Sequence, residues 1–166
     1  MVPSVSPSST SVDVLTIQGT YDLTYEKVNE IIGTATDVYV DGYVSIGEGA
    51  FKGSSIRTIR IGKSVIGIKD QAFKGVNSLT NIIFDDGSKL KTIGYQSLHS
   101  TSLESLTLPV STSVIFDEAF ARCNKLLSVT LTGDNLTYIG HNAFAESSII
   151  SLTANKNQLD TLNLSV

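Results

Sequence analysis

The sequence predicts a β-rich repeat solenoid, in which short coils of chain stack along a single axis. The first observation is an Ile-Gly-x-x-Ala-Phe motif that begins at Ile46 and returns, whole or altered, at four later places. The second is a ladder of apolar residues, spaced as Leu-x-x-Leu-x-Leu, that follows each copy of the motif. The third is composition, because 41% hydrophobic and 17% charged residues are ordinary for a soluble protein, here expected to form one elongated domain.

Each repeat contributes one set of motif anchors and one ladder. The anchors are Ile46/Ala50/Phe51, Ile68/Ala72/Phe73, Ile93/Ser97/Leu98, Ile115/Ala119/Phe120 and Ile139/Ala143/Phe144. The ladders are Ile56/Ile59/Ile61, Leu79/Ile82/Phe84, Leu103/Leu106/Leu108, Leu126/Val129/Leu131 and Ile149/Leu152/Ala154. Successive anchor isoleucines are 22, 25, 22 and 24 residues apart, inside the window of roughly 20 to 29 residues that leucine-rich repeats occupy. The gap from the anchor alanine position to the ladder alternates between six and seven residues, so pairing of the repeats is left open.

The two patterns predict different sides of each coil. Alternate ladder residues should point inward, and strands from successive coils should stack into a parallel sheet, because one strand cannot bury its apolar face alone. The Ala-Phe pair should form a tight turn on the far side, with the aromatic ring in the core. We expect the glycines after the anchor isoleucines, Gly47, Gly94 and Gly140, to allow sharp bends.

The fourth repeat carries the clearest family signal, Ala119-Phe120-Ala121-Arg122-Cys123-Asn124-Lys125-Leu126, and Pro109 follows a ladder. This rhythm resembles the BspA-type (Treponema pallidum-type) leucine-rich repeat over about residues 46–162. The departures are Ser97-Leu98 in place of Ala-Phe, and Lys69 and Phe116 in place of glycine. The resemblance implies a leucine-rich-repeat solenoid with right-handed coils. One parallel sheet would form the concave face, with tight turns and short helical or extended segments on the convex face.

The chain divides into three predicted parts. Residues 1–11 form a flexible Ser/Pro-rich lead, residues 12–45 a capping coil with one short helix, and residues 46–166 five repeats. Thr24 is the expected N-cap of the helix, Leu23 and Val28 its hydrophobic staple, and Gly33 its end. The last repeat runs into an incomplete sixth. Its open end indicates either self-association or a sequence cut from a longer array, and both remain open.

Catalytic and cofactor chemistry finds no support in the sequence. The two histidines, His99 and His141, occupy different columns of the repeat, so they are expected to be solvent-facing loop residues and no metal site is predicted. No nucleophile elbow, zinc-protease motif or phosphate-binding loop is present, and no cofactor is expected. The single Cys123 is expected to be buried and inert, in the position that the family packs inside the coil.

Charge and hydropathy exclude further classes of partner. The net charge is -4, which argues against nucleic acid, and no apolar run approaches the roughly 20 residues of a membrane span. The N-terminus shows neither a basic region nor an apolar core, so no signal peptide is visible.

The outward face of the ladder strands is the candidate site. One predicted column changes from aromatic, cationic and aliphatic side chains to threonines along the stack. With Arg57, which lies in the same ladder as Arg60, the predicted partner-binding residues are Tyr39, Arg57, Arg60, Ile83, Thr107, Thr130 and Thr153. Mixed aromatic and arginine surfaces are typical of interface anchors, although Ser and Thr columns also suit any exposed sheet face.

The sequence therefore favours a non-enzymatic binding module over an enzyme. The family resemblance implies an adhesin-like, cell-surface or secreted protein whose partner is a protein, such as an extracellular-matrix or host surface protein, or a glycan. The alternative is a structural or self-assembly segment that forms a homo-oligomer through its uncapped C-terminal end.

Overall fold

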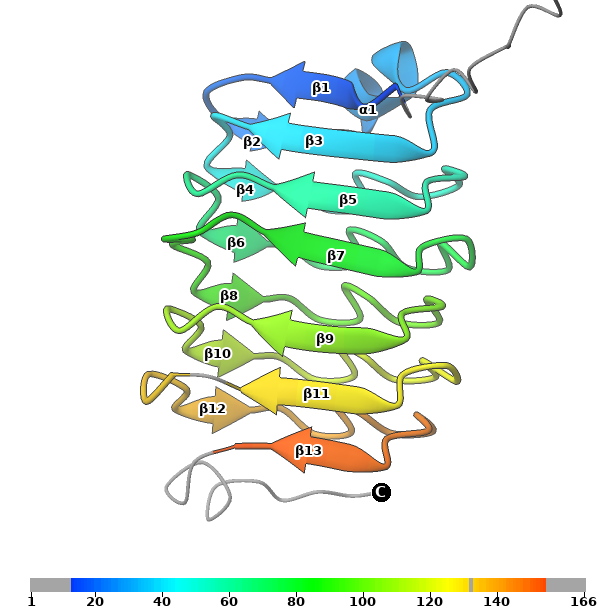
Figure 1. The fold of residues 1–166 in the computed structure, drawn as a ribbon. Coiled ribbons are helices and arrows are strands. Elements are labelled where there is room, and N and C mark those ends of the chain that lie inside the picture. Colours follow the sequence, from blue (N-terminus) through cyan, green and yellow to red (C-terminus); the bar gives the residue numbers. More distant parts are fainter. Residues whose placement is uncertain (1–12, 132, 155–166) are drawn as a thin grey trace, which may run out of the picture.

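The computed structural model describes residues 13–131 and 133–154. Each coil of the chain contributes one longer strand to a broad face and one two-residue strand to a second side, and the coils stack into a column (Figure 1). The longer strands are β1 (Leu15–Gln18), β3 (Asp37–Asp41), β5 (Thr58–Ile61), β7 (Asn81–Phe84), β9 (Ser105–Leu108), β11 (Ser128–Leu131) and β13 (Ser151–Thr153). The short strands are β2 (Asp22–Leu23), β4 (Ser45–Ile46), β6 (Gly67–Ile68), β8 (Thr92–Ile93), β10 (Val114–Ile115) and β12 (Tyr138–Ile139).

The strands form three parallel sheets, whereas the sequence predicted one. The short strands make a continuous six-stranded sheet, in which the anchor isoleucines pair from coil to coil. The longer strands divide into a four-stranded sheet, β1-β3-β5-β7, and a three-stranded sheet, β9-β11-β13. We call the outward surface of these two sheets the broad face. The prediction of a β-rich parallel solenoid is confirmed, and the prediction of a single sheet is wrong.

The ladder registers agree with the predicted columns within each sheet. Ile59 pairs with Val38 and Ile82, and Val129 pairs with Leu106 and Leu152. Ile59 and Val129 are no more than 1% exposed, as are Ile56 and Leu126 at the start of the same ladders. One continuous apolar core thus runs through the stack.

The predicted core aromatics are buried in two stacked pairs. The rings of Phe51 and Phe73 lie 4.9 Å apart, and those of Phe120 and Phe144 lie 5.1 Å apart. Leu98 holds the equivalent position in the coil between the two pairs and is also buried. The predicted burial of Cys123 is confirmed as well, and burial raises the pKa of its thiol despite hydrogen bonds with Thr101.

The glycines after the anchor isoleucines have a different role from the predicted one. A Cβ atom on Gly94 would lie 2.7 Å from the backbone N of Asp70, and one on Gly140 would lie 2.3 Å from the backbone N of Asp117. A Cβ atom on Gly47 would lie 2.7 Å from the carbonyl oxygen of Leu23. These glycines permit close approach of neighbouring coils, and their φ angles lie outside the left-handed region that favours glycine.

The N-terminal coil carries the one α-helix of the described residues, α1 (Tyr25–Ile31). Thr24 caps it as predicted, because its hydroxyl oxygen accepts a hydrogen bond from the backbone N–H of Lys27 at 3.3 Å. Leu23 and Val28 are buried, as expected for a hydrophobic staple, and Gly33 follows the helix with φ of 49°. The predicted lead at residues 1–11 and the incomplete sixth repeat after residue 154 lie outside the described residues.

The residue before each anchor alanine position adopts a left-handed backbone. Gly49 does so at φ of 59°, and the later coils place Gln71, Gln96, Glu118 and Asn142 there, at φ of 50° to 55°. We expect Gln71→Gly to raise the free energy of unfolding by about 0.5 to 1 kcal/mol, because the relieved strain exceeds the entropy gained by the unfolded chain. Urea denaturation measures the change. Gln71→Ala, which keeps a Cβ, serves as the control, and equal stability of the two variants would contradict the assignment.

Candidate functional site

The structure places the predicted site residues in two separate columns of the broad face. Tyr39, Arg60 and Ile83 pair in register across β3, β5 and β7. Thr107, Thr130 and Thr153 pair in register across β9, β11 and β13. Arg57 is exposed and lies one residue before β5. The sequence predicted one column, and the break between β7 and β9 divides it.

Two residues of the first column, Tyr39 and Arg60, form an ordered cluster with Asp85. The guanidinium carbon of Arg60 lies 5.1 Å from the ring centroid of Tyr39, a cation–π geometry. Arg60 Nε donates a hydrogen bond to Asp85 Oδ1 at 2.5 Å, and Tyr39 Oη donates one to Asp85 Oδ2 at 3.0 Å. A single carboxylate thus holds both side chains, and the three residues come from three successive coils.

The electrostatics of this cluster favour a charged arginine and a neutral tyrosine. The hydrogen bond to Asp85 raises the pKa of Tyr39 above its ordinary value. The same carboxylate, mainly through its hydrogen bond, raises the pKa of Arg60. Because the Arg60 side chain is 58% exposed, the ion pair contributes little to stability, and its main effect is to order the surface.

Asp85 was missed as a site residue. The sequence showed Asp85 and Asp86 as adjacent acids on a turn, which do not suit acid–base catalysis. The signal was the strand alternation itself: continued past the end of β7, it places Asp85 on the same side as the outward Ile83. That side is the broad face, where Arg60 lies one coil earlier.

The second column presents hydroxyl groups. Its threonines and the neighbouring serines make no side-chain hydrogen bond within the described parts of the chain; they are Thr107, Thr130, Thr153, Ser105, Ser128 and Ser151. These hydroxyls are free to meet a polar partner or solvent.

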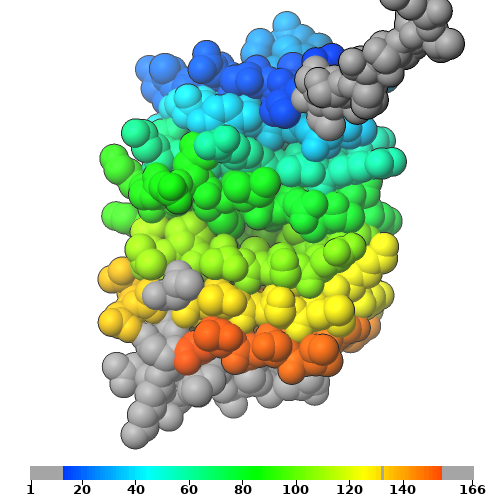
Figure 2. Space-filling model, viewed as in Figure 1, coloured from blue at the N-terminus to red at the C-terminus, as the bar shows by residue number. Residues whose placement is uncertain are grey.

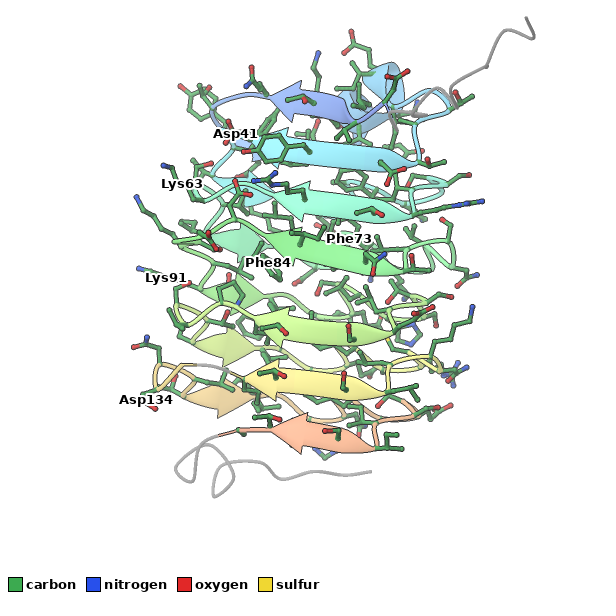
Figure 3. All side chains as sticks on the ribbon, in the orientation of Figure 1. Asp41, Lys63, Phe73, Phe84, Lys91 and Asp134 are labelled. Carbon is green, nitrogen blue, oxygen red and sulfur yellow. The ribbon has the colours of Figure 1, made fainter. Side chains whose placement is uncertain are left out.

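A groove of about 500 Å³ separates the two columns. Its lining comes from residues 81–88 of β7 and the following turn, and from Ser105, Thr107, Leu108, Pro109 and Val110 of β9 and its end. β7 and β9 lie farther apart than the other neighbouring strands of the broad face (Figure 1), and Figure 2 shows the gap between the green and yellow-green surfaces. Figure 3 shows Phe84 at the C-terminal end of β7, beside this gap.

The histidines lie on the turn side. His141 is exposed as predicted, but His99 is half-buried, and burial lowers its pKa. His99 Nδ1 lies 2.8 Å from the hydroxyl of Ser100, and this side chain faces solvent only in part. In residues 13–131 and 133–154, no group of three His, Cys, Asp or Glu side chains is arranged to hold a metal ion. No helix in those ranges has the length and hydropathy to cross a membrane.

The coils stack along one axis, and each contributes a strand with an apolar ladder to the broad face. This architecture defines a leucine-rich-repeat solenoid. The family model of the BspA type leucine rich repeat region matches residues 44–164 in six copies. The chain belongs to this BspA-type leucine-rich-repeat family. Comparison of the sequence with curated proteins gives no significant match.

Solved structures share the fold. A leucine-rich-repeat protein of T. pallidum is 29% identical with a TM-score of 0.67, over 73% of this chain and 59% of that one. The pneumococcal vaccine antigen PcpA is 17% identical with a TM-score of 0.51, over 89% of this chain and 42% of that one. The chain therefore spans less than two thirds of the length of both proteins.

Proposed function

We propose that this chain is a non-enzymatic module that binds a macromolecular partner, a protein or a glycan, through its broad face. The observation that carries the proposal is the cluster of Tyr39, Arg60 and Asp85. Tyrosine and arginine are the side chains most often found at the energetic centre of protein interfaces. Here both are held in place before any partner arrives, which lowers the entropy lost on binding.

The neighbouring surface supports the same proposal. Ile83 lies in register with Arg60 and is 49% exposed, so an apolar side chain extends the cluster toward the groove. Arg57 adds a second exposed cation at the start of β5. The hydroxyl column beyond the groove would supply the polar rim that surrounds such anchors.

We further propose that the module acts at the cell surface or in secreted form, in an adhesin-like role, as its family membership implies. Extracellular-matrix proteins, host surface proteins and glycans are the partner classes to test. Function resides in sites more than in folds, so the partner has to be identified by binding.

Arg60→Glu is expected to weaken binding of the chain to its partner at least about tenfold, because it removes the cation and repels Asp85. The purified chain is titrated against immobilised matrix proteins and glycans, and the affinity of each variant is measured by surface plasmon resonance. Lys52→Glu makes the same change of charge at an exposed turn residue and should leave affinity unchanged. Equal affinity of Arg60→Glu and the unsubstituted chain would exclude this cluster as the binding site.

A further inference from the structure

We propose that the solenoid contains a seam between the coils of β7 and β9, at which it divides into two cooperative units. The N-terminal half comprises residues 13–88, with α1 and β1 to β7, and the C-terminal half comprises residues 92–131 and 133–154, with β8 to β13. Either half can open while the other stays folded. The seam is a property of the packing between coils, and it does not depend on what the broad face binds.

The contacts between neighbouring coils decide whether a repeat protein opens as one unit. Its stability is close to a sum of terms for single coils and for the interfaces between neighbours. Where all interfaces are equally strong, the stack loses structure together. One interface that is much weaker than the others allows the two sides to open separately.

Backbone pairing is reduced at the seam. β5 and β7 pair over four residues, and so do β9 and β11, whereas the broad strands of the described residues form no ladder between β7 and β9. At the end of β7, Asp85 N–H donates to Ile61 O at 3.0 Å. The equivalent residue after β9 is Pro109, which has no N–H, so this link is absent as well. Near the start of the strands, Ser102 N–H still donates to Leu79 O at 3.0 Å.

The aromatic core is also interrupted there. The rings of Phe51 and Phe73 stack within the N-terminal half, and those of Phe120 and Phe144 stack within the C-terminal half. Leu98 holds the aromatic position in the first coil beyond the seam. Neither stack of rings therefore crosses from one half to the other.

The apolar ladder of β7 is incompletely covered. Ile82 and Phe84 are only partly buried, whereas the equivalent Ile59 and Ile61 of β5 are fully buried. The groove on the broad face lies against these two side chains. Because burial of apolar surface is the main favourable contribution to folding, an interface that buries less of it is weaker.

A buried hydroxyl weakens the same interface further. Ser97 replaces the anchor alanine and is fully buried, and its Oγ has no hydrogen-bond partner among the described residues. Its backbone oxygen accepts the N–H of Phe73 across the seam at 2.7 Å, so the unpaired hydroxyl belongs to a residue at the junction. A polar group that loses water without gaining a partner lowers stability.

The seam is closed in the native structure. β6 pairs with β8 through Ile68 and Ile93, so the six-stranded sheet crosses from one half to the other. The hydrogen bond from Phe73 N–H to Ser97 O joins the halves on the turn side. The weak interface therefore sets where the stack divides when it opens, and the native halves remain stacked.

This division has a consequence for the broad face. The cluster of Tyr39, Arg60 and Asp85 lies entirely in the N-terminal half, and the threonine column lies in the C-terminal half. Opening of the C-terminal half removes the hydroxyl column and leaves the cluster in place.

Native-state amide hydrogen exchange in low concentrations of urea tests the seam. Phe51→Ala and Phe120→Ala are a matched pair, because both rings are fully buried and each stacks within its own half. We expect Phe51→Ala to speed exchange of the most protected amides of β5 at least about tenfold, and those of β11 less than about twofold. Phe120→Ala should act in the opposite sense. Equal acceleration of β5 and β11 by either variant would mean that the stack opens as one unit, and the proposal would be overturned.

A milder pair of variants keeps the test decisive if an alanine variant does not fold. Ile59→Val and Ile115→Val each shorten a fully buried side chain, one in each half. Each should speed exchange in its own half and leave the other unchanged. Acceleration in both halves by one of these changes would likewise overturn the seam.

Ser97→Ala probes the junction itself, because it removes the unpaired hydroxyl and restores the repeat motif. Exchange should slow at least about twofold in both β7 and β9, since opening either half breaks this interface. Ala119→Ser makes the reverse change at the same repeat position one coil later, and it should speed exchange in β11 and leave β5 unchanged. Equal exchange in Ser97→Ala and the unsubstituted chain would overturn the weakening assigned to this hydroxyl.

Exchange is measured on the chain without a partner, so the two proposals fail separately. A stack that opens as one unit leaves the proposed function standing. A partner whose affinity is the same for Arg60→Glu and the unsubstituted chain removes the proposed binding site and leaves the seam standing.

Discussion

Phe73→Ala is expected to lower the free energy of unfolding by about 3 to 5 kcal/mol, the usual cost of deleting a buried aromatic ring. Phe73 is fully buried, and its ring stacks on that of Phe51 with 12° between their planes. The neighbouring coils are held in register on both sides by backbone pairing, for example from Phe73 N–H to Ser97 O at 2.7 Å. They cannot collapse into the space, so a cavity remains.

Chemical denaturation with circular dichroism measures this loss. Tyr21→Ala removes an aromatic ring that is 82% exposed and should change stability by less than about 0.5 kcal/mol. Since each coil contacts mainly its neighbours, amide hydrogen exchange should show the largest loss of protection in the coils of Phe51 and Phe73. A loss below 1 kcal/mol would mean that the stack is looser than the structure shows.

Gly94→Ala is expected to destabilise the solenoid by about 1 to 3 kcal/mol or more, the cost of overpacking a tight contact. The added Cβ would lie 2.7 Å from both the carbonyl carbon of Lys69 and the backbone N of Asp70. Lys69 directly follows β6, and Gly94 directly follows β8, which pairs with β6. The strain therefore acts on the continuous six-stranded sheet.

Phe116→Ala is the matched comparison for Gly94→Ala. It changes the same repeat position one coil later, where a side chain is present and 44% exposed, and it should have a much smaller effect. Thermal unfolding of the two variants separates the cases. Equal melting temperatures for Gly94→Ala and the unsubstituted chain would show that the coils do not approach closely at this point.

These close contacts give a physical reason for the alternation between six-residue and seven-residue gaps in the repeats. Glycine follows the anchor isoleucine in the repeats of Gly47, Gly94 and Gly140, and the two intervening repeats carry Lys69 and Phe116. At each of the three glycines, the backbone of the preceding coil comes too close for a Cβ atom. The same three repeats have the six-residue gap between anchor and ladder, so close coils and short gaps occur together.

Much of the candidate site could be predicted, because strand alternation decides which side chains face outward. Tyr39, Arg60 and Ile83 pair in the predicted column. Asp85, which orders this face, was not found as a site residue, although strand alternation puts it on the same side as Ile83. The periodicity does not say which side chains it bonds, because Arg60 lies one coil earlier and Tyr39 two coils earlier. The binding role of the site residues stays a prediction.

The sequence by itself determined the repeat, the inward residues of the ladders, the burial of the aromatic residues and the helix cap. Each depends on periodicity or on contacts between near neighbours in the chain. Only the tertiary structure decided that the anchor isoleucines form a sheet of their own, and that the broad face breaks between β7 and β9. The reason is that sheet continuity depends on hydrogen bonds between coils, whereas the hydrophobic pattern continues unchanged from β7 to β9.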